Sequence, residues 1–331
     1  MSEVDEDQFL GRHTALSLLK QRKKIWRRMP YLRENDGHAP PIVLAVGDRR
    51  RVYAIAHRLK NALLLPEAAA KLENPRSLSR APAIEFGRIA MAIGTLSSIP
   101  VLVVETQMGS PATQIILNEV LSNQLTSNEY RVGNQRISLQ HKVVIRVGTA
   151  GGINCGTAPA VRVGDVVNAT HSIGATGATI QTLSRLDFWQ PQVYEKFQSK
   201  WTNLGSDFTI TRGGHPRVEC SREVVEAIDH AGTRLVRNAY SRGGNITKDS
   251  LYAELSNDIF LELCRTENCR TTEMELSAIA LAAHEHQAAF GMISAIVGVL
   301  PGSSFAQKQE TRSMAEDRAV RVGLDAVTFL C

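Results

Sequence analysis

The chain is poor in several residues and segments that mark particular protein classes. It has only 5 cysteines and 5% aromatic residues in 331. The cysteines form no Cys-x-x-Cys pair, which argues against a zinc site and a disulfide framework. No run approaches the ~18 consecutive apolar residues that a membrane span needs. The first residues lack the apolar core of a signal peptide and the last three lack a peroxisomal signal, so we expect a cytoplasmic protein.

What the chain does contain is typical of a globular protein. Hydrophobic residues make up 43% of it, which is enough for a full core. The length fits two domains or one large α/β domain with additions. The net charge is only +5, and six of the nine residues from Lys20 to Arg28 are basic. This segment fits either a nucleic-acid patch or nuclear signal, or the solvated face of an N-terminal helix, and we favour the helix.

Short apolar, β-branched runs alternate with helical patterns along most of the chain. Buried strands are expected at 42–46, 99–104, 143–147, 165–168 and 293–297. Helices are expected at 51–64, 113–125, 222–231, 257–264, 275–286 and 314–330. This alternation predicts an α/β fold with a mixed, largely parallel central sheet flanked by helices on both faces. We expect a helical extension over 1–39 and a single domain over 40–331, with insertions near 122–140 and 182–219.

Three glycine-marked or acidic segments at strand ends carry the chemistry. Val46-Gly47-Asp48 is followed by Arg51, and backbone N–H groups with a nearby arginine suit an anion. Arg146-Val-Gly-Thr149 places a charge in an apolar strand, where it needs a partner or a ligand. Glu273-Met-Glu275 opens an alanine-rich helix, where the helix dipole also favours carboxylates. Neither the Gly-x-Gly-x-x-Gly spacing nor the phosphate loop of nucleoside triphosphatases is present.

Four motifs, in this order, resemble those of the nucleoside phosphorylase superfamily, which includes uridine phosphorylases and hexameric purine nucleoside phosphorylases. They are Val46-Gly-Asp-x-x-Arg51, Val101-Leu-Val-Val-Glu-Thr-Gln-Met-Gly109-Ser-Pro111, Arg146-Val-Gly-Thr149-Ala-Gly151 and Glu273-Met274-Glu275. The resemblance covers residues 40–330 and is nearest to the uridine phosphorylase branch.

The resemblance implies a role for each matching residue. Those that correspond to phosphate ligands are Gly47, Arg51, Arg80, Arg146 and Thr149, with Arg80 lent by a neighbouring subunit. Those that correspond to ribose contacts are Tyr31, Thr149, Met274 and Glu275, with Tyr31 lent by the neighbour. Arg146 and Glu275 correspond to the catalytic pair.

The activity that the resemblance implies is that of a pentosyltransferase. Inorganic phosphate, the co-substrate, attacks C1′ of a uridine-like nucleoside, and free base and ribose 1-phosphate result. No cofactor and no metal is implied. We expect a cytoplasmic enzyme of nucleotide salvage, acting as a homodimer or higher homo-oligomer with shared active sites and without nucleic-acid or membrane partners.

The base-recognition motifs of the family are missing. Asp249-Ser-Leu-Tyr252 is followed by Ala-Glu-Leu-Ser rather than Gln-x-Arg, and Gly298–Gly302 holds neither the Asp of purine enzymes nor the Arg of uridine enzymes. The base site is therefore unassigned, with Lys248, Asp249, Glu254 and Gln307 as alternative contacts. Two other readings remain: a catalytically weak or inactive paralogue that binds a nucleoside, phosphate or an active partner, and a nucleosidase of the same fold. The sugar of the substrate, ribose or deoxyribose, and the oligomeric state, dimer or hexamer, also stay open.

Overall fold

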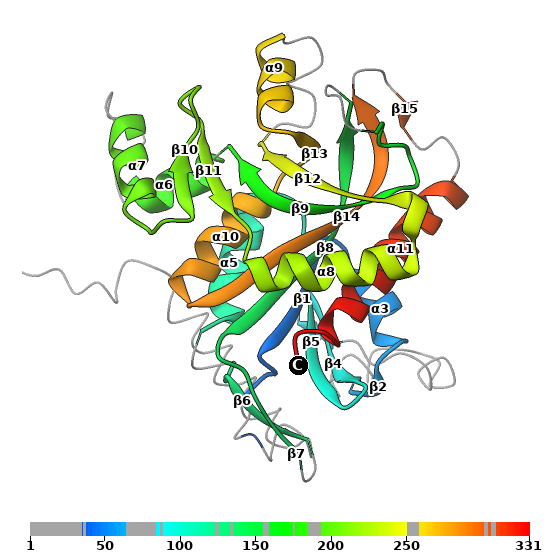
Figure 1. Ribbon diagram of the computed structural model, residues 1–331. Helices are drawn as coiled ribbons and strands as arrows, with labels where there is room; N and C mark the ends of the chain where they lie inside the picture. Colours follow the sequence, from blue (N-terminus) through cyan, green and yellow to red (C-terminus); the bar gives the residue numbers. More distant parts are fainter. Residues whose placement is uncertain are drawn as a thin grey trace, which may run out of the picture.

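The computed structural model describes most of the chain. The described residues are 35, 38–63, 84–86, 89–122, 126–132, 135–154, 159–174, 176–184, 193–249, 258–300, 304–305 and 309–331. The element labels below are those of Figure 1.

The centre of the fold is a set of parallel, fully covered strands. β1 (Ile42–Val46) pairs in parallel with β5 (Ile99–Glu105) on one side and with β8 (Lys142–Ile153) on the other. β14 (Ala288–Leu300) runs parallel to β8 along its whole length. Every residue of β1 is buried, which explains its unbroken apolar sequence. The strands expected at these places are confirmed, as is the α/β fold class.

β14 also closes a ring of strands. It pairs with β8 on one edge and with β9 (Val166–Ile173) on the other. β9 pairs with β12 (Tyr240–Thr247), which pairs with β13 (Cys269–Glu273), and β13 returns to β8. β8 therefore belongs both to this ring and to the open sheet that contains β1, and this one strand joins the two parts.

Antiparallel strands extend the sheet at its edges. On the β5 side these are β4 (Ile89–Leu96), β2 (Lys60–Leu63) and β3 (Ile84–Phe86). On the β9 side these are β11 (Pro216–Glu219) and β10 (Phe208–Ile210). β15 (Ser304–Phe305) pairs with the end of β14. β6 (Glu129–Val132) and β7 (Gln135–Ser138) form a separate hairpin.

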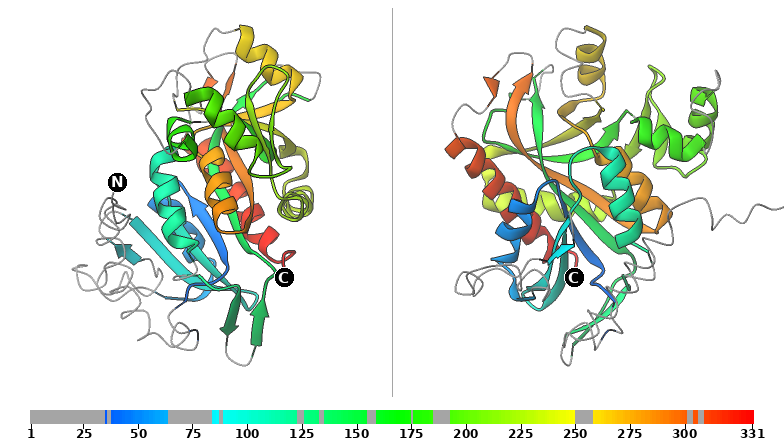
Figure 2. Two further views of the ribbon diagram at one scale, coloured as in Figure 1. Left: turned by 90° about the vertical axis from the view of Figure 1, so that its left-hand side faces the viewer. Right: turned by 180° about the vertical axis from the view of Figure 1, so that it is seen from behind.

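Helices cover both faces of the sheet (Figure 2). On one face, α5 (Ser110–Val120) packs against α10 (Leu276–Glu285). On the other lie α3 (Arg49–Ala56), α8 (Arg222–Leu235) and α11 (Gln309–Val327). Alternate residues of β1 enter the two cores, Val43 towards α5 and α10, and Leu44 towards α3 and α11.

The predicted insertion at 182–219 is a packed excursion. It contains α7 (Val193–Thr202) and the β10–β11 pair, and it follows α6 (Gly177–Ser184). Trp201 is fully buried between the rings of Phe197 and Phe208. The Trp201 indole N–H donates to the carbonyl oxygens of Thr209 and Arg217. The insertion near 122–140 contains the β6–β7 hairpin. Outside both insertions, α9 (Asp258–Thr266) precedes β13.

Two other sequence expectations fare differently. The helix expected over 51–64 is wrong in its second half, because α3 ends at Ala56 and the chain returns as β2. Nearly all of the predicted extension over 1–39 lies outside the described residues.

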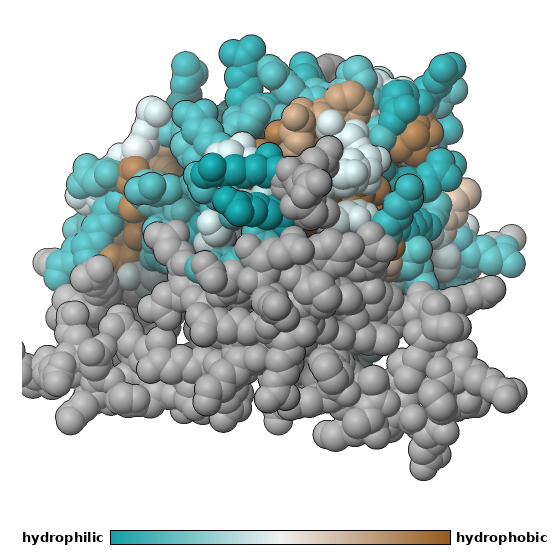
Figure 3. All heavy atoms as spheres, turned by 90° about the horizontal axis from the view of Figure 1, so that it is seen from below, coloured by the Kyte–Doolittle hydropathy of each residue, from teal (hydrophilic) through white to brown (hydrophobic). Residues whose placement is uncertain are grey.

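Seen from below, the described surface carries hydrophilic side chains around separate apolar patches (Figure 3). Among the helices of the described part, none is long and apolar enough to cross a membrane.

Candidate active site

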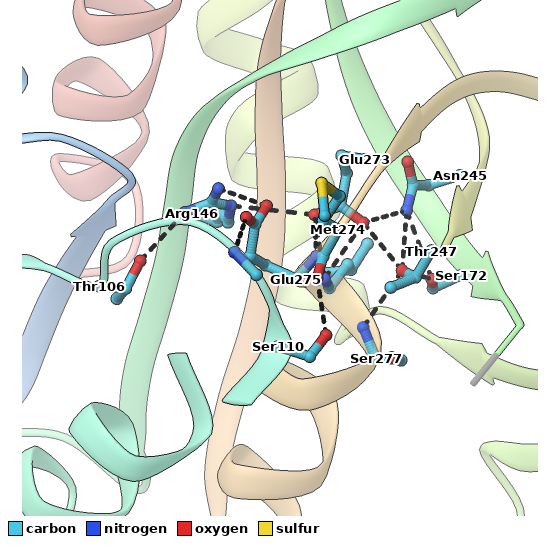
Figure 4. Close-up of polar contacts among 12 residues, drawn as sticks. Thr106, Ser110, Arg146, Ser172, Asn245, Thr247, Glu273, Met274, Glu275 and Ser277 are labelled. Carbon is cyan, nitrogen blue, oxygen red and sulfur yellow. Dashed lines mark hydrogen bonds and ion pairs between the residues drawn. The ribbon is translucent and has the colours of Figure 1, made fainter. Parts of the chain in front are cut away.

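The carboxyl ends of β1 and β5 meet the middle of β8. The Thr106 N–H, just after β5, donates to the Val46 carbonyl at the end of β1, with N···O 2.7 Å. The Arg146 side chain on β8 reaches the same place, because its Nη1 donates to Thr106 Oγ1 at 3.2 Å. Ligands of open α/β sheets commonly bind at such carboxyl ends. Figure 4 shows Arg146 between Thr106 and the start of α10.

Arg146 forms a buried ion pair with Glu275, the residue that precedes α10. Arg146 Nη2 lies 2.6 Å from Glu275 Oε2, and both side chains are about 5% exposed or less. Burial alone raises the pKa of Glu275, but the Arg146 guanidinium and the Gly109 N–H together hold this pKa below its ordinary value. Glu275 is therefore a carboxylate at neutral pH, with its charge fixed beside Arg146.

Gly109 brings the loop before α5 onto the same carboxylate. Its N–H donates to Glu275 Oε1 at 2.7 Å, and its φ of +91° lies in a region that favours glycine. The next residue, Ser110, donates its hydroxyl to the Met274 carbonyl at 2.6 Å. Two adjacent residues of this loop thus fix the start of α10.

A second buried guanidinium, that of Arg51, faces the site from α3. Its Nη1 donates to the Val147 carbonyl at 3.1 Å and its Nη2 to Asp48 at 3.0 Å. Asp48 also caps α3 by accepting from the Arg50 and Arg51 backbone N–H groups. Burial lowers the pKa of Arg51 and the nearby Arg146 charge lowers it further, while Asp48 opposes this. Among the described residues, buried Arg51 Nε has no hydrogen-bond partner, so one N–H donor is left for a ligand.

Gly47, directly after β1, lies beside the Arg146 guanidinium. A Cβ atom at this position would lie 3.4 Å from Arg146 Nη2 and 3.6 Å from the Gln107 carbonyl oxygen. Glycine therefore leaves the backbone open beside the guanidinium. Two guanidinium groups and nearby backbone N–H groups form a cradle of the kind that binds a phosphate dianion.

Glu273, at the end of β13, supports the site from behind. Its carboxylate accepts from the Glu275 N–H at 2.7 Å and the Leu276 N–H at 3.0 Å, at the start of α10. Asn245 Nδ2 and Thr247 Oγ1, both on β12, donate to it at 2.8 Å. Burial and the Glu275 charge raise the pKa of Glu273 to about 7. Its proton is therefore exchanged near neutral pH, close to the Arg146–Glu275 pair.

The structure brings together four of the residues singled out in the sequence: Gly47, Arg51, Arg146 and Glu275. Thr149 lies three residues beyond Arg146 on β8 and is half-buried, as is Met274 between the two glutamates. Tyr31 and Arg80 lie outside the described residues.

Other functional candidates were missed in the sequence. Thr106, Ser110 and Glu273 were seen only as parts of motifs, since their contacts come from segments more than 20 residues away. Asn245-Ile-Thr247 has a period of two, which places both polar side chains on one face of β12.

Only part of the expected base side is described. Glu254 and Gln307 lie outside the described residues. Asp249 accepts from the Gly177 N–H at 2.6 Å, so it anchors the start of α6. The Lys248 N–H donates to the Glu273 carbonyl at 3.0 Å, and burial lowers the pKa of its ammonium group to about 8. Within the described ranges, no group of three or more His, Cys, Asp or Glu side chains could hold a metal ion.

Comparisons with known proteins agree on one family. A family model described as the phosphorylase superfamily matches residues 42–328. No curated protein matches the chain by sequence.

Solved structures match over nearly the whole chain. The uridine phosphorylase of Vibrio fischeri ES114, complexed with 6-hydroxy-1-naphthoic acid, has a TM-score of 0.56 and 16% identity, over 88% of this chain and 92% of that one. The purine nucleoside phosphorylase of Toxoplasma gondii, in complex with immucillin-H, has a TM-score of 0.57 and 19% identity, over 87% and 90%. At these identities the likeness is one of fold, and it is shared by a uridine and a purine enzyme.

Proposed function

The chain belongs to the phosphorylase superfamily, and we propose that it is a nucleoside phosphorylase that cleaves the N-glycosidic bond of a uridine-like nucleoside with inorganic phosphate. One observation carries this proposal: the buried guanidinium groups of Arg51 and Arg146 lie near each other, and that of Arg146 lies beside Gly47 and the Glu275 carboxylate. Asp48 pairs with Arg51 and Glu275 with Arg146, and a phosphate would supply acceptors for the remaining N–H donors of both guanidinium groups.

Phosphate is the anion that suits this cradle. Arg51 Nε has an N–H group without a hydrogen-bond partner among the described residues, and a guanidinium fork can bind two phosphate oxygens at once. We assign Gly47, Arg51, Arg146 and Thr149 to phosphate, with Arg80 of a second subunit completing the set.

Glu275 is suited to the ribose. An ionised carboxylate accepts hydrogen bonds from two neighbouring hydroxyl groups, and the Arg146 ion pair keeps Glu275 ionised. We assign the 2′ and 3′ hydroxyls to Glu275, the sugar face to Met274, and the remaining ribose contacts to Thr149 and the partner copy's Tyr31 position.

The reaction follows from these positions. A phosphate oxygen forms a bond to C1′ while the C1′–N bond breaks, and its electron pair leaves with the base. Positive charge develops on the sugar ring in the transition state. The phosphate and the Glu275 carboxylate, held in place before the reaction, stabilise that charge without reorganising. Arg146 contacts Glu275 and faces the phosphate cradle, so it orients both reactants.

One alternative function rests on a specific observation, and a second is disfavoured by the same site. The missing base-site motifs favour a weak or inactive paralogue that binds a nucleoside, phosphate or an active partner. A nucleosidase would use water in place of phosphate, so the two cations Arg51 and Arg146 would give it no advantage.

The uridine-like preference rests on the resemblance around Asp249. The cytoplasmic salvage role and the homodimer with shared sites are part of the same proposal.

The test is release of free base from a panel of nucleosides with and without phosphate. We expect release that requires phosphate and is fastest with uridine or a near analogue. Arg146→Lys keeps the charge but loses the fork, and it should reduce the rate by about 10²-fold. The matched control is Arg242→Lys, on an exposed arginine that pairs with Asp229. Release without phosphate would identify a nucleosidase, and binding of ribose 1-phosphate without turnover would identify an inactive paralogue.

A further inference from the structure

A second, strongly basic groove, lined by none of the candidate active-site residues, lies between α11 and the segment that follows α8. It has a volume of about 450 Å³, within the range of small-molecule sites. It is lined by Arg234, Leu235, Val236, Arg237, Asn238, Met314, Asp317, Arg318 and Arg321. Figure 1 shows α8 and α11 side by side, on the sheet face opposite α5 and α10.

The groove concentrates positive charge. Four of its lining residues are arginines and one is an aspartate. On α11 the lining residues Met314, Asp317, Arg318 and Arg321 follow a spacing of three and four, so they form one stripe of the helix. The opposite wall is a continuous segment, 234–238, with two more arginines. Arginines therefore line the cavity on both walls.

Three of these guanidinium groups contact protein acceptors. Arg234 pairs with Asp325, Arg318 Nη1 donates to the Gly164 carbonyl at 2.7 Å, and Arg321 lies 3.8 Å from Asp317. Since a guanidinium has five N–H donors, these contacts leave donors for a ligand. For Arg318, the hydrogen bond to Gly164 lowers the entropy cost of binding an anion.

Arg237 differs from the other three. The described residues include no ion-pair partner for it. It is an exposed residue in η2 (Arg237–Ala239), and its φ of +36° is uncommon for a side chain of this size. Strained backbone of this kind often occurs at ligand sites. The neighbouring turn is closely packed, because Gly232 lies against the Tyr240 ring and the Tyr240 hydroxyl donates to Asp229.

The groove also has apolar walls. Leu235 and Val236 line one side, and Met314 on the other is 46% exposed. A methionine side chain adapts well to the flat face of a ring. A ligand that matches these residues carries several negative charges and an apolar ring.

We propose that this groove binds a nucleoside polyphosphate, with its phosphates on Arg237, Arg318 and Arg321 and its base against Met314 and Val236. The phosphate chain supplies acceptors for guanidinium forks from both walls. This site is distinct from the Arg51–Arg146 cradle, and its occupancy does not depend on the proposed phosphorolysis.

The test is isothermal titration calorimetry of the full chain with ATP, tripolyphosphate and adenosine as probes. We expect ATP to bind more tightly than tripolyphosphate, and adenosine to bind weakest. The double variant Arg237→Glu/Arg321→Glu should weaken ATP binding by about tenfold or more. The single variant Arg237→Ala changes one exposed side chain and should weaken it by about threefold or more.

Two controls make the result specific. Arg222→Glu/Arg265→Glu makes the same charge change at two exposed arginines outside the groove, and it should leave ATP affinity unchanged. Arg146→Lys alters the candidate active site and should also leave it unchanged. The proposal is wrong if ATP does not bind, or if the groove variants bind it as wild type does. It is also wrong if Arg146→Lys alone abolishes binding, and the base assignment is wrong if tripolyphosphate binds as tightly as ATP. Base release, measured separately, reports on the proposed phosphorylase function.

Discussion

Arg51 and Arg146 are held by different means, although their charges lie close together. Arg146 is neutralised by Glu275 at 2.6 Å, whereas Arg51 binds a partly exposed Asp48 and a backbone carbonyl. The Arg51 side chain is 8% exposed, so little water reaches it. Arg51 is therefore the less fully compensated of the two charges, and an arriving anion gains most by meeting it.

This difference predicts the effect of a conservative change. Arg51→Lys keeps the positive charge but removes the planar fork, so we expect KM for phosphate to rise by about tenfold or more. KM for the nucleoside should change little. The matched control is Arg50→Lys on the same helix, where the side chain is 72% exposed. Steady-state kinetics with each substrate varied in turn check this, and equal KM values for phosphate in the two variants would contradict the assignment.

Glu275 gives a second prediction. Glu275→Gln keeps the size of the side chain but removes the charge beside the sugar, so we expect kcat to fall by about 10²-fold or more. The phosphate KM should move less than kcat. Glu226→Gln, on an exposed carboxyl of α8, is the control. A variant with wild-type kcat would show that Glu275 does not stabilise the transition state.

At the scale of elements, the turn before α5 connects two motifs that are far apart in sequence. Gly109 is 166 residues from Glu275, yet its N–H fixes one of the two carboxylate oxygens. The turn depends on a positive φ, which any residue with a Cβ adopts only at a cost.

Gly109→Ala should therefore reduce both stability and activity. We expect a loss of about 1 kcal/mol in the free energy of unfolding from backbone strain. The control is Gly214→Ala, where φ is +81° and no atom lies within 4 Å of the added Cβ. It carries comparable strain at a distance from the site. Denaturant unfolding and base release separate the two effects, and an equal loss of rate in both variants would contradict a role for Gly109.

The difference between apolar and polar strands explains which elements could be predicted from sequence. β1 and β5 are buried on both faces, so their apolar runs were recognisable without any tertiary information. β12 and β13 were not recognised, because polar residues such as Asn245 and Thr271 satisfy one another inside the ring. Arg146 and Glu275 were identified because a family motif contains them. The support that Glu273 gives them depends on β12 and β13 being neighbours, which no local pattern reveals.

At the scale of the whole molecule, Glu273 couples the site to global stability. Its pKa is about 7 in the folded protein, against an ordinary value of 4.5. Between these values the native state binds more protons than the unfolded chain, so the free energy of unfolding falls as pH rises. This carboxyl contributes full stabilisation below pH 4.5, and the contribution is lost as pH rises through about 7.

The free energy of unfolding should fall measurably across this window. Denaturant unfolding at a series of pH values measures it. Glu273→Gln has no proton to lose, so its stability should depend less on pH across this window than that of the wild type. Glu226→Gln serves again as the control and should follow the wild-type curve. If Glu273→Gln also follows that curve, Glu273 does not titrate in this range.

The closed ring of strands has a consequence for synthesis of the chain. β14 supplies hydrogen bonds to β8 and β9 at once, and it begins at residue 288. A growing polypeptide that has not yet reached β14 leaves both of these strands with an unsatisfied edge. Unpaired edges of apolar strands invite association between chains. Nascent chains that stall before β14 should therefore be the species that needs chaperone protection.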